Sequence, residues 1–120
     1  MTILITGGNG FLANSLKTYI GTVNVSDSNE AKEIAVQSIK SHNLDFTFLL
    51  AKIETKTVIV GCKNNETLDS FDVSEIVSKA SKLYGGGASK DSTLSIGGGP
   101  SEYDDDKCIE YVTQEFTKNI

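Results

Sequence analysis

Apolar residues recur with a helical period in three segments, which predicts helices from about Asn29 to His42, Asp72 to Tyr84 and Asp105 to Lys118. The polar cluster Ser26–Ser28 supplies an N-cap for the first helix, and Asp72 followed by Glu75 gives the second a capping-box-like start. The residues expected to face the core are Ala31, Ile34, Ala35 and Ile39 in the first helix, Val73, Ile76, Val77, Ala80 and Leu83 in the second, and Cys108, Val112 and Phe116 in the third.

Short apolar or alternating runs between these segments predict strands at Ile3–Thr6, Val23–Val25, Asp45–Ile53 and Thr57–Gly61. The last two are separated by a tight turn, so we expect them to form a hairpin. A further helix is expected from about Phe11 to Ile20. The fold class is therefore α/β: a small mixed sheet with helices packed on it, and a glycine-rich loop between the last two helices.

Composition limits the possible functions. The chain has 120 residues and a net charge of −5, and all eleven of its cationic residues are lysines. Such an acidic chain is a poor general binder of nucleic acid, because non-specific affinity comes mainly from neutralised phosphates. Any contact with RNA must therefore be local. No apolar run approaches the roughly 20 residues that span a bilayer, so we expect no membrane association and a cytoplasmic location.

The residues that most often bind metal are sparse and scattered. Cys62 and Cys108 lie far apart in the sequence, and the only histidine is His42. A structural zinc site needs four clustered ligands, so we predict no metal site and interpret the cysteines as small buried side chains. No residue is assigned a catalytic role.

Two glycine triplets, Gly85–Gly87 and Gly97–Gly99, bracket nine residues that include Lys90 and Asp91. Consecutive glycines cost backbone entropy and are kept where φ is positive or where a backbone or ligand approaches closely. Successive free amides in such a loop can form an anion site. A flexible surface loop is the simpler interpretation of one triplet, whereas two triplets around Lys90 favour a functional loop.

This pattern resembles the glycine-loop accessory domain that follows DHH-type phosphoesterase domains and recurs at the C-terminus of alanyl-tRNA synthetases, most of all in archaeal members. The resemblance covers about Val23 to Phe116, so the chain would divide into an N-terminal strand–glycine turn–helix extension (1–22) and the accessory domain (23–120). Phosphoesterase relatives usually carry a histidine where this chain has Ala88. This difference weakens the interpretation of the chain as the substrate-binding domain of such an enzyme.

The resemblance implies a non-catalytic module that binds the alanine-accepting tRNA, forms a homodimer and works with the other domains of a parent synthetase. ATP, magnesium and zinc would belong to that parent, and no cofactor is expected in this chain. The residues expected to contact RNA are Lys82, Gly85, Gly86, Gly87, Lys90, Gly97, Gly98 and Gly99.

A competing motif lies near the N-terminus. Gly7, Gly10 and Ala13 have the spacing of a dinucleotide-binding fingerprint, and Asp27 stands near the position of the acid that binds the ribose. This segment resembles the opening of nucleotide-sugar epimerases and short-chain dehydrogenases, so an NAD-binding fragment is the alternative function. Tyr103 and Lys107 also have the Tyr-x-x-x-Lys spacing of those enzymes. The chain is, however, short for a full doubly wound sheet.

Overall fold

A six-stranded mixed sheet runs through the centre of the protein, with strand order β1-β2-β3-β4-β6-β5. β2 and β3 are parallel, and the other neighbouring pairs are antiparallel. The computed structural model describes residues 4–5, 17–54, 56–64 and 71–118. The strands are β1 (Leu4–Ile5), β2 (Lys17–Asn24), β3 (Phe46–Ile53), β4 (Lys56–Lys63), β5 (Gly87–Ala88) and β6 (Leu94–Gly99), and the helices are α1 (Ser28–Ser41), α2 (Val73–Leu83) and α3 (Asp105–Lys118).

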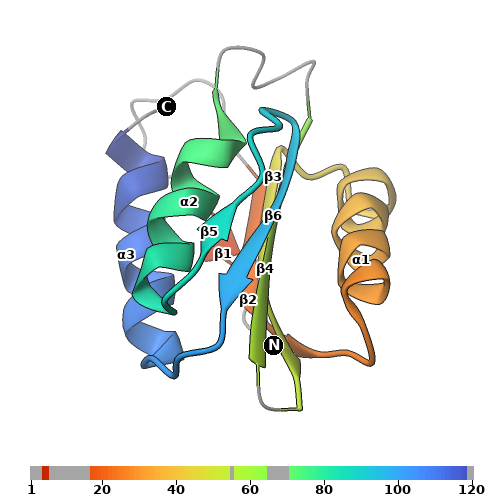
Figure 1. The fold of residues 1–120 in the computed structure, drawn as a ribbon. Coiled ribbons are helices and arrows are strands. Elements are labelled where there is room, and N and C mark those ends of the chain that lie inside the picture. Colours follow the sequence, from red (N-terminus) through yellow and green to blue (C-terminus); the bar gives the residue numbers. More distant parts are fainter. Residues whose placement is uncertain (1–3, 6–16, 55, 65–70, 119–120) are drawn as a thin grey trace.

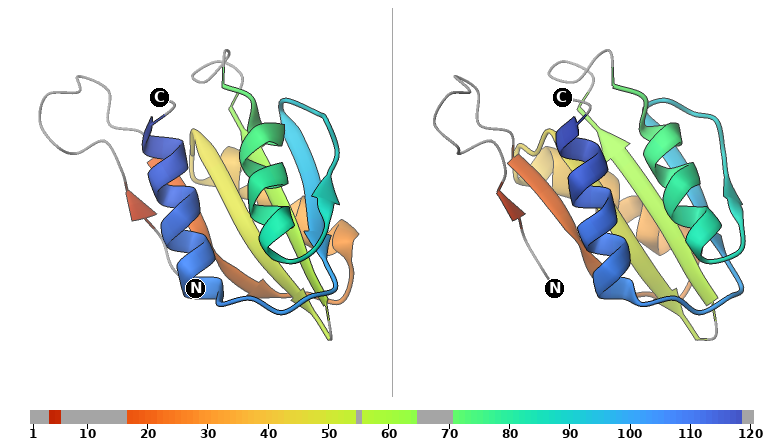
Figure 2. Two further views of the ribbon diagram at one scale, coloured as in Figure 1. Left: turned by 60° about the vertical axis from the view of Figure 1, so that its left-hand side comes forward. Right: turned by 90° about the vertical axis from the view of Figure 1, so that its left-hand side faces the viewer.

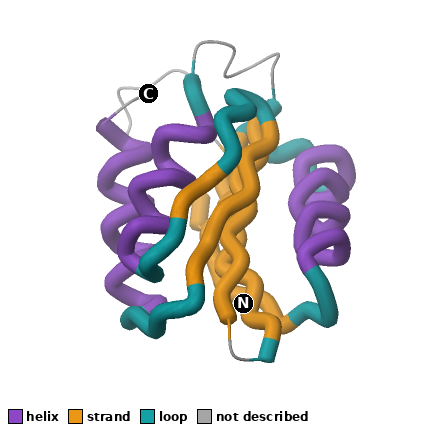
Figure 3. Tube along the Cα trace, in the orientation of Figure 1, coloured by secondary structure: helices purple, strands orange, loops and turns teal. Residues whose placement is uncertain are grey.

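Helices cover both faces of the sheet and produce three layers (Figures 1 and 3). α1 lies on one face against β3 and β4, while α2 and α3 lie side by side on the other (Figure 2). α2 packs on β4 and β6, and α3 reaches β2. This arrangement confirms the predicted α/β class with a small mixed sheet.

Strand β3 explains why both faces need a helical cover. Its residues Phe46, Phe48 and Leu50 belong to the core beneath α2 and α3, whereas Leu49 and Ala51 belong to the core beneath α1. All five side chains are fully buried. Because side chains alternate between the two faces of a strand, this apolar run can be stable only between two layers.

All three predicted main helices are present, and each begins at an acidic residue. The carboxylate of Asp27 accepts a hydrogen bond from the amide of Glu30 at 2.8 Å, and that of Asp72 accepts one from the amide of Ser74 at 2.9 Å. Asp104 accepts hydrogen bonds from the amides of two residues in the first turn of α3. These side chains satisfy amides that lack partners within the helix, which fixes where each helix starts.

The helix predicted from Phe11 to Ile20 is wrong over its described part. Residues Lys17–Ile20 belong to strand β2, which pairs in parallel with β3 from Thr18 to Asn24. Long-range pairing with a buried neighbour overrides the local helical pattern here. The boundary expected between residues 22 and 23 falls inside this same strand. The remainder of the predicted helix lies outside the described residues.

The glycine-rich segment also differs from the expected loop. Gly87 and Ala88 form β5, and the whole second triplet belongs to β6. β5 pairs with β6, which pairs in turn with β4, so this segment completes one edge of the sheet. Gly85, Gly86 and the short connection around Lys90 are the parts of this segment outside helix and strand.

Three aromatic rings pack together where α3 meets the sheet. The ring of Phe116 stacks on that of Phe46 with centroids 4.5 Å apart, and meets the ring of Phe71 edge-on at 5.2 Å. Phe116 is fully buried together with Cys108 and Val112, as the periodicity of α3 predicts. The last helix is therefore an integral part of the core.

Candidate nucleic-acid interface

The glycines of the two triplets allow backbones to pack against each other. A Cβ atom on Gly86 would lie 1.7 Å from the carbonyl oxygen of Gly98. Gly98 itself has a φ of +123°, and a Cβ there would lie 2.1 Å from the carbonyl oxygen of Thr57. Residues with a Cβ atom rarely adopt such a φ, and a Cβ atom cannot fit at such distances. The lack of side chains in the triplets therefore lets the segment around Gly86, strand β6 and strand β4 pack closely together.

Several glycine amides that we expected to face a ligand are already used within the protein. Gly98 donates its amide proton to Oγ of Ser81 at 2.8 Å, and Gly86 donates to the carbonyl oxygen of Ser81 at 2.9 Å. The amide of Gly85 donates to the carbonyl oxygen of Lys82 at 3.1 Å. These three amides are therefore not available to bind an anion.

The connection between β5 and β6 is held by its own hydrogen bonds. Asp91 accepts hydrogen bonds from the amides of Thr93 and Leu94 at 2.8 and 3.1 Å, and these bonds lower the pKa of its carboxyl group. On the other side of the turn, the amide of Ser89 donates to the carbonyl oxygen of Ile96 at 2.9 Å. Lys90 therefore lies between two residues, Ser89 and Asp91, that are held by hydrogen bonds.

An open, shallow groove lies between α2 and this connection. The structure brings the two predicted lysines, Lys82 from α2 and Lys90 from the turn, into its lining. It adds Lys79, which the sequence analysis did not single out, although it precedes Lys82 by one helical turn. The rest of the lining consists of Asp72, Ser74, Glu75, Ser78, Ala88 and Ser89.

Some of the charged side chains in this groove have partners within the protein, and others have none among the described residues. Lys79 forms an ion pair with Glu115 of α3 at 3.5 Å, and Asp72 is occupied at the start of α2. Lys82 and Lys90 are exposed. Within the described part of the chain, the groove therefore presents two unpaired ammonium groups to solvent beside that of Lys79, and a lining of lysines and serines suits a phosphate–sugar backbone.

The second glycine triplet borders a different shallow groove. Gly97–Gly99 line it together with Lys56, Val58 and Pro100. Thr57, which lies between Lys56 and Val58 in β4, also lines this groove. Of the residues that we expected to form one RNA-binding surface, Lys82 and Lys90 line the first groove and Gly97–Gly99 line the second, whereas Gly85–Gly87 line neither. Lys56 is a further cation that sequence reasoning missed, because only the pairing of β4 with β6 brings it beside the triplet.

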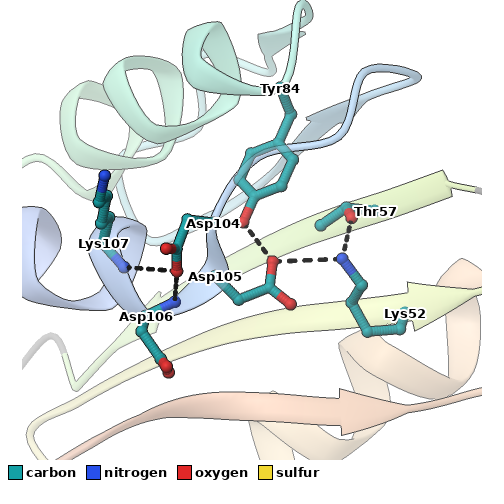
Figure 4. A network of polar contacts seen from close by, with 7 residues as sticks. All are labelled: Lys52, Thr57, Tyr84, Asp104, Asp105, Asp106 and Lys107. Atoms are coloured by element: carbon teal, nitrogen blue, oxygen red, sulfur yellow. Dashed lines mark hydrogen bonds and ion pairs between the residues drawn. The ribbon is translucent and has the colours of Figure 1, made fainter.

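A polar network lies near this second groove and connects three elements (Figure 4). The buried Tyr84 donates a hydrogen bond from its hydroxyl group to Asp105 Oδ1 at 2.5 Å. Lys52 Nζ donates to the same carboxylate oxygen at 3.2 Å and to Oγ1 of Thr57 at 2.6 Å. Burial, followed by the bond to Asp105, raises the pKa of Tyr84 far above its ordinary value. The network ties α3 to the β3–β4 hairpin and holds its tyrosine neutral.

Comparison with known proteins bears on the fold. No protein-family model and no curated protein matches the chain. Among solved structures, the chain is similar to the crystal structure of the C-Ala domain from Aquifex aeolicus alanyl-tRNA synthetase, with a TM-score of 0.76 and 16% sequence identity. The match covers 95% of this chain and 96% of that chain.

The chain has the C-Ala fold. The finding confirms the architecture that the resemblance to the synthetase accessory domain implied, at a level of identity where few side chains are shared. The similarity extends over almost the full length of both chains, so the described sheet and its helices belong to one shared arrangement.

The C-Ala fold of this chain does not support the dinucleotide-binding alternative. In a dinucleotide-binding unit, the strands before and after the glycine turn are parallel, whereas β1 and β2 are antiparallel here. Asp27, the expected ribose ligand, is the N-cap of α1. Gly7, Gly10 and Ala13 lie outside the described residues.

The Tyr-x-x-x-Lys pair is also poorly placed for catalysis. Tyr103 precedes α3 and packs its ring edge-on against Tyr84 at 5.7 Å, whereas Lys107 lies within the helix. The two residues thus do not share a helical face, where residues four apart meet. In Figure 4 the ammonium group of Lys107 points away from the Tyr84 network.

The two cysteines are buried free thiols, as the sequence analysis predicted. Burial is the main cause that raises the pKa of Cys108 to about 11, and burial followed by the charge of Asp91 raises that of Cys62.

His42 is exposed at the C-cap of α1. Among the residues that the structure describes, no group of three or more histidine, cysteine or acidic side chains could hold a metal ion. Within the same residues, no helix is long and apolar enough to cross a membrane.

Proposed function

We propose that this chain is a tRNA-binding accessory domain of an alanyl-tRNA synthetase. The observation that carries the proposal is the C-Ala fold, which the chain shares over nearly its whole length with a domain of such an enzyme. The partner is the alanine-accepting tRNA, and the other domains of the parent enzyme supply the aminoacylation chemistry. ATP, magnesium and zinc bind to those domains, in the cytoplasm, where translation takes place.

The groove between α2 and the β5–β6 connection is the RNA-binding surface. Three lysines line this groove, two from α2 and one from the β5–β6 connection, which supports contacts with the phosphates of a nucleic-acid strand. With a net charge of −5 for the whole chain, attraction cannot come from the overall field of the protein. Binding is therefore local, modest in strength and steeply dependent on salt.

Measurement of tRNA affinity over a range of salt concentrations tests this function. Neutralising three phosphates gives a slope of log affinity against log salt of about −2.7 for duplex-like RNA, at roughly 0.9 per contact by analogy with DNA. Lys82→Ala and Lys90→Ala should each make this slope shallower by about one unit. Lys40→Ala is the matched control, because this exposed lysine lies at the end of α1, on the opposite face of the sheet.

The control variant decides the interpretation. If Lys40→Ala reduces the slope as much as the groove variants do, the groove is not the site. If the wild-type chain binds no tRNA at low salt, the proposed function itself is wrong. A second part of the proposal, that two copies associate, is tested by sedimentation equilibrium with and without tRNA; a monomer in both conditions would contradict it.

A further inference from the structure

A carboxylate lines the lysine groove without an ion-pair partner among the described residues. Glu75 lies in the first turn of α2, and its side chain is exposed and contributes to the groove. The other acidic residue of the lining, Asp72, uses Oδ1 to accept hydrogen bonds from both the amide and the hydroxyl group of Ser74. Glu75 is thus the acidic residue of the lining with both carboxylate oxygens open to a ligand, whereas Asp72 has one oxygen occupied.

Such a carboxylate is favourable for the helix, because it lies in the first turn of α2, but it opposes the binding of phosphates in the groove. Like charges a few ångströms apart repel each other, and here the repulsion would partly cancel the attraction from Lys79, Lys82 and Lys90. A carboxylate has no proton to donate to a phosphate oxygen, so it can only accept hydrogen bonds. It becomes favourable if the ligand presents a donor close to its phosphates.

The ribose of RNA presents that donor. Its 2′-hydroxyl group lies next to the phosphate on every nucleotide, can donate a hydrogen bond, and is absent from DNA. Carboxylates accept bonds from ribose hydroxyl groups in nucleotide-binding proteins. The serine hydroxyls of the groove, by contrast, can bond to sugar and phosphate alike and do not discriminate between them.

We propose that Glu75 is a specificity-determining residue that accepts a hydrogen bond from a 2′-hydroxyl group and so selects RNA in the lysine groove. The lysines supply affinity for the phosphates, and Glu75 converts part of this affinity into discrimination by repelling a strand that offers no compensating donor. This inference rests on the proposed function, because it assumes that a nucleic-acid strand occupies the groove.

The test uses a synthetic RNA stem–loop and the same stem–loop with fluorine at every 2′ position. Fluorine preserves the A-form geometry of the strand but has no proton to donate. The wild-type chain should bind the hydroxyl form about two- to tenfold more tightly, the net value of one hydrogen bond. Glu75→Ala should bind both forms equally, and Glu75→Gln, which keeps a neutral acceptor, should show an intermediate preference.

The matched control is Glu33→Ala, which removes the same charge from an exposed residue of α1 on the opposite face of the sheet. It should keep the wild-type preference. If Glu75→Ala strengthens the binding of both stem–loops by the same factor, Glu75 only repels phosphates and the inference is overturned. If Lys82→Ala and Lys90→Ala leave the binding of both stem–loops unchanged, the groove is not the site and the inference is overturned, whereas the proposed function fails only if the wild-type chain binds no tRNA.

Discussion

Substitution of two adjacent glycines provides a sharp test of how the glycine-rich segment is built. A Cβ atom on Gly86 would meet the carbonyl oxygen of Gly98 at 1.7 Å and its carbonyl carbon at 2.7 Å, and would lie 3.0 Å from Cα of Gly99. At Gly87, no heavy atom of the described residues lies within 4 Å of the added Cβ. We therefore expect Gly86→Ala to be strongly destabilising and Gly87→Ala to be harmless.

The cost of Gly86→Ala follows from the contacts that must separate. Because the opposing atoms are backbone, no side chain can rotate away, and the two backbone segments must move apart by on the order of 1 Å to restore van der Waals distance. This displacement breaks the bond from the Gly86 amide to Ser81 and the two-residue pairing of β5 with β6. About three hydrogen bonds at roughly 1 kcal/mol each give a loss of about 3 kcal/mol.

Thermal and urea unfolding, followed by circular dichroism, measure the effect. A loss of about 3 kcal/mol lowers the melting temperature of a domain of this size by roughly 10 °C. Gly87→Ala should leave the stability unchanged or raise it by up to about 1 kcal/mol, because alanine reduces the entropy of the unfolded chain. Equal stability of the two variants would show that the triplets are not packed against each other and would refute the reasoning.

Two further variants test the core and the buried thiol. Phe116→Ala, which removes the ring stacked on Phe46, should cost about 3–5 kcal/mol in urea unfolding, whereas alanine at the exposed Tyr103 should cost less than about 1 kcal/mol. Folding raises the pKa of Cys108 from 9.0 to about 11, so its contribution to stability is complete below pH 9 and is lost as the pH rises to 11. Wild type should therefore lose about 2 kcal/mol more than Cys108→Ala over that interval, and parallel pH profiles would contradict this assignment.

The sequence alone determined the three long helices and the β3–β4 hairpin, because their causes are local. α1 and α2 start at capping carboxylates, Asp27 and Asp72, and each helix buries the face that its apolar period marks. The hairpin closes at the predicted turn, with Ile53 paired to Lys56. Interactions between residues a few positions apart suffice to specify such elements.

Tertiary structure decided the features that depend on distant partners. Lys17–Ile20 is strand and not helix because β3 offers pairing partners from Thr18 onward and β1 pairs with Lys17 and Thr18. The second glycine triplet is sheet and not loop because β4 can approach a chain without side chains, and no local rule reveals this approach.

The candidate site shows the same division. Lys82 and Lys90 could be singled out from the sequence because they flank a conspicuous motif. That they share a groove with Lys79 and Glu75 depends on how the β5–β6 connection lies against α2. The sequence specified which charges are present, and their grouping into one surface required the long-range pairing that brings helix and hairpin together, since electrostatic recognition depends on distances in space.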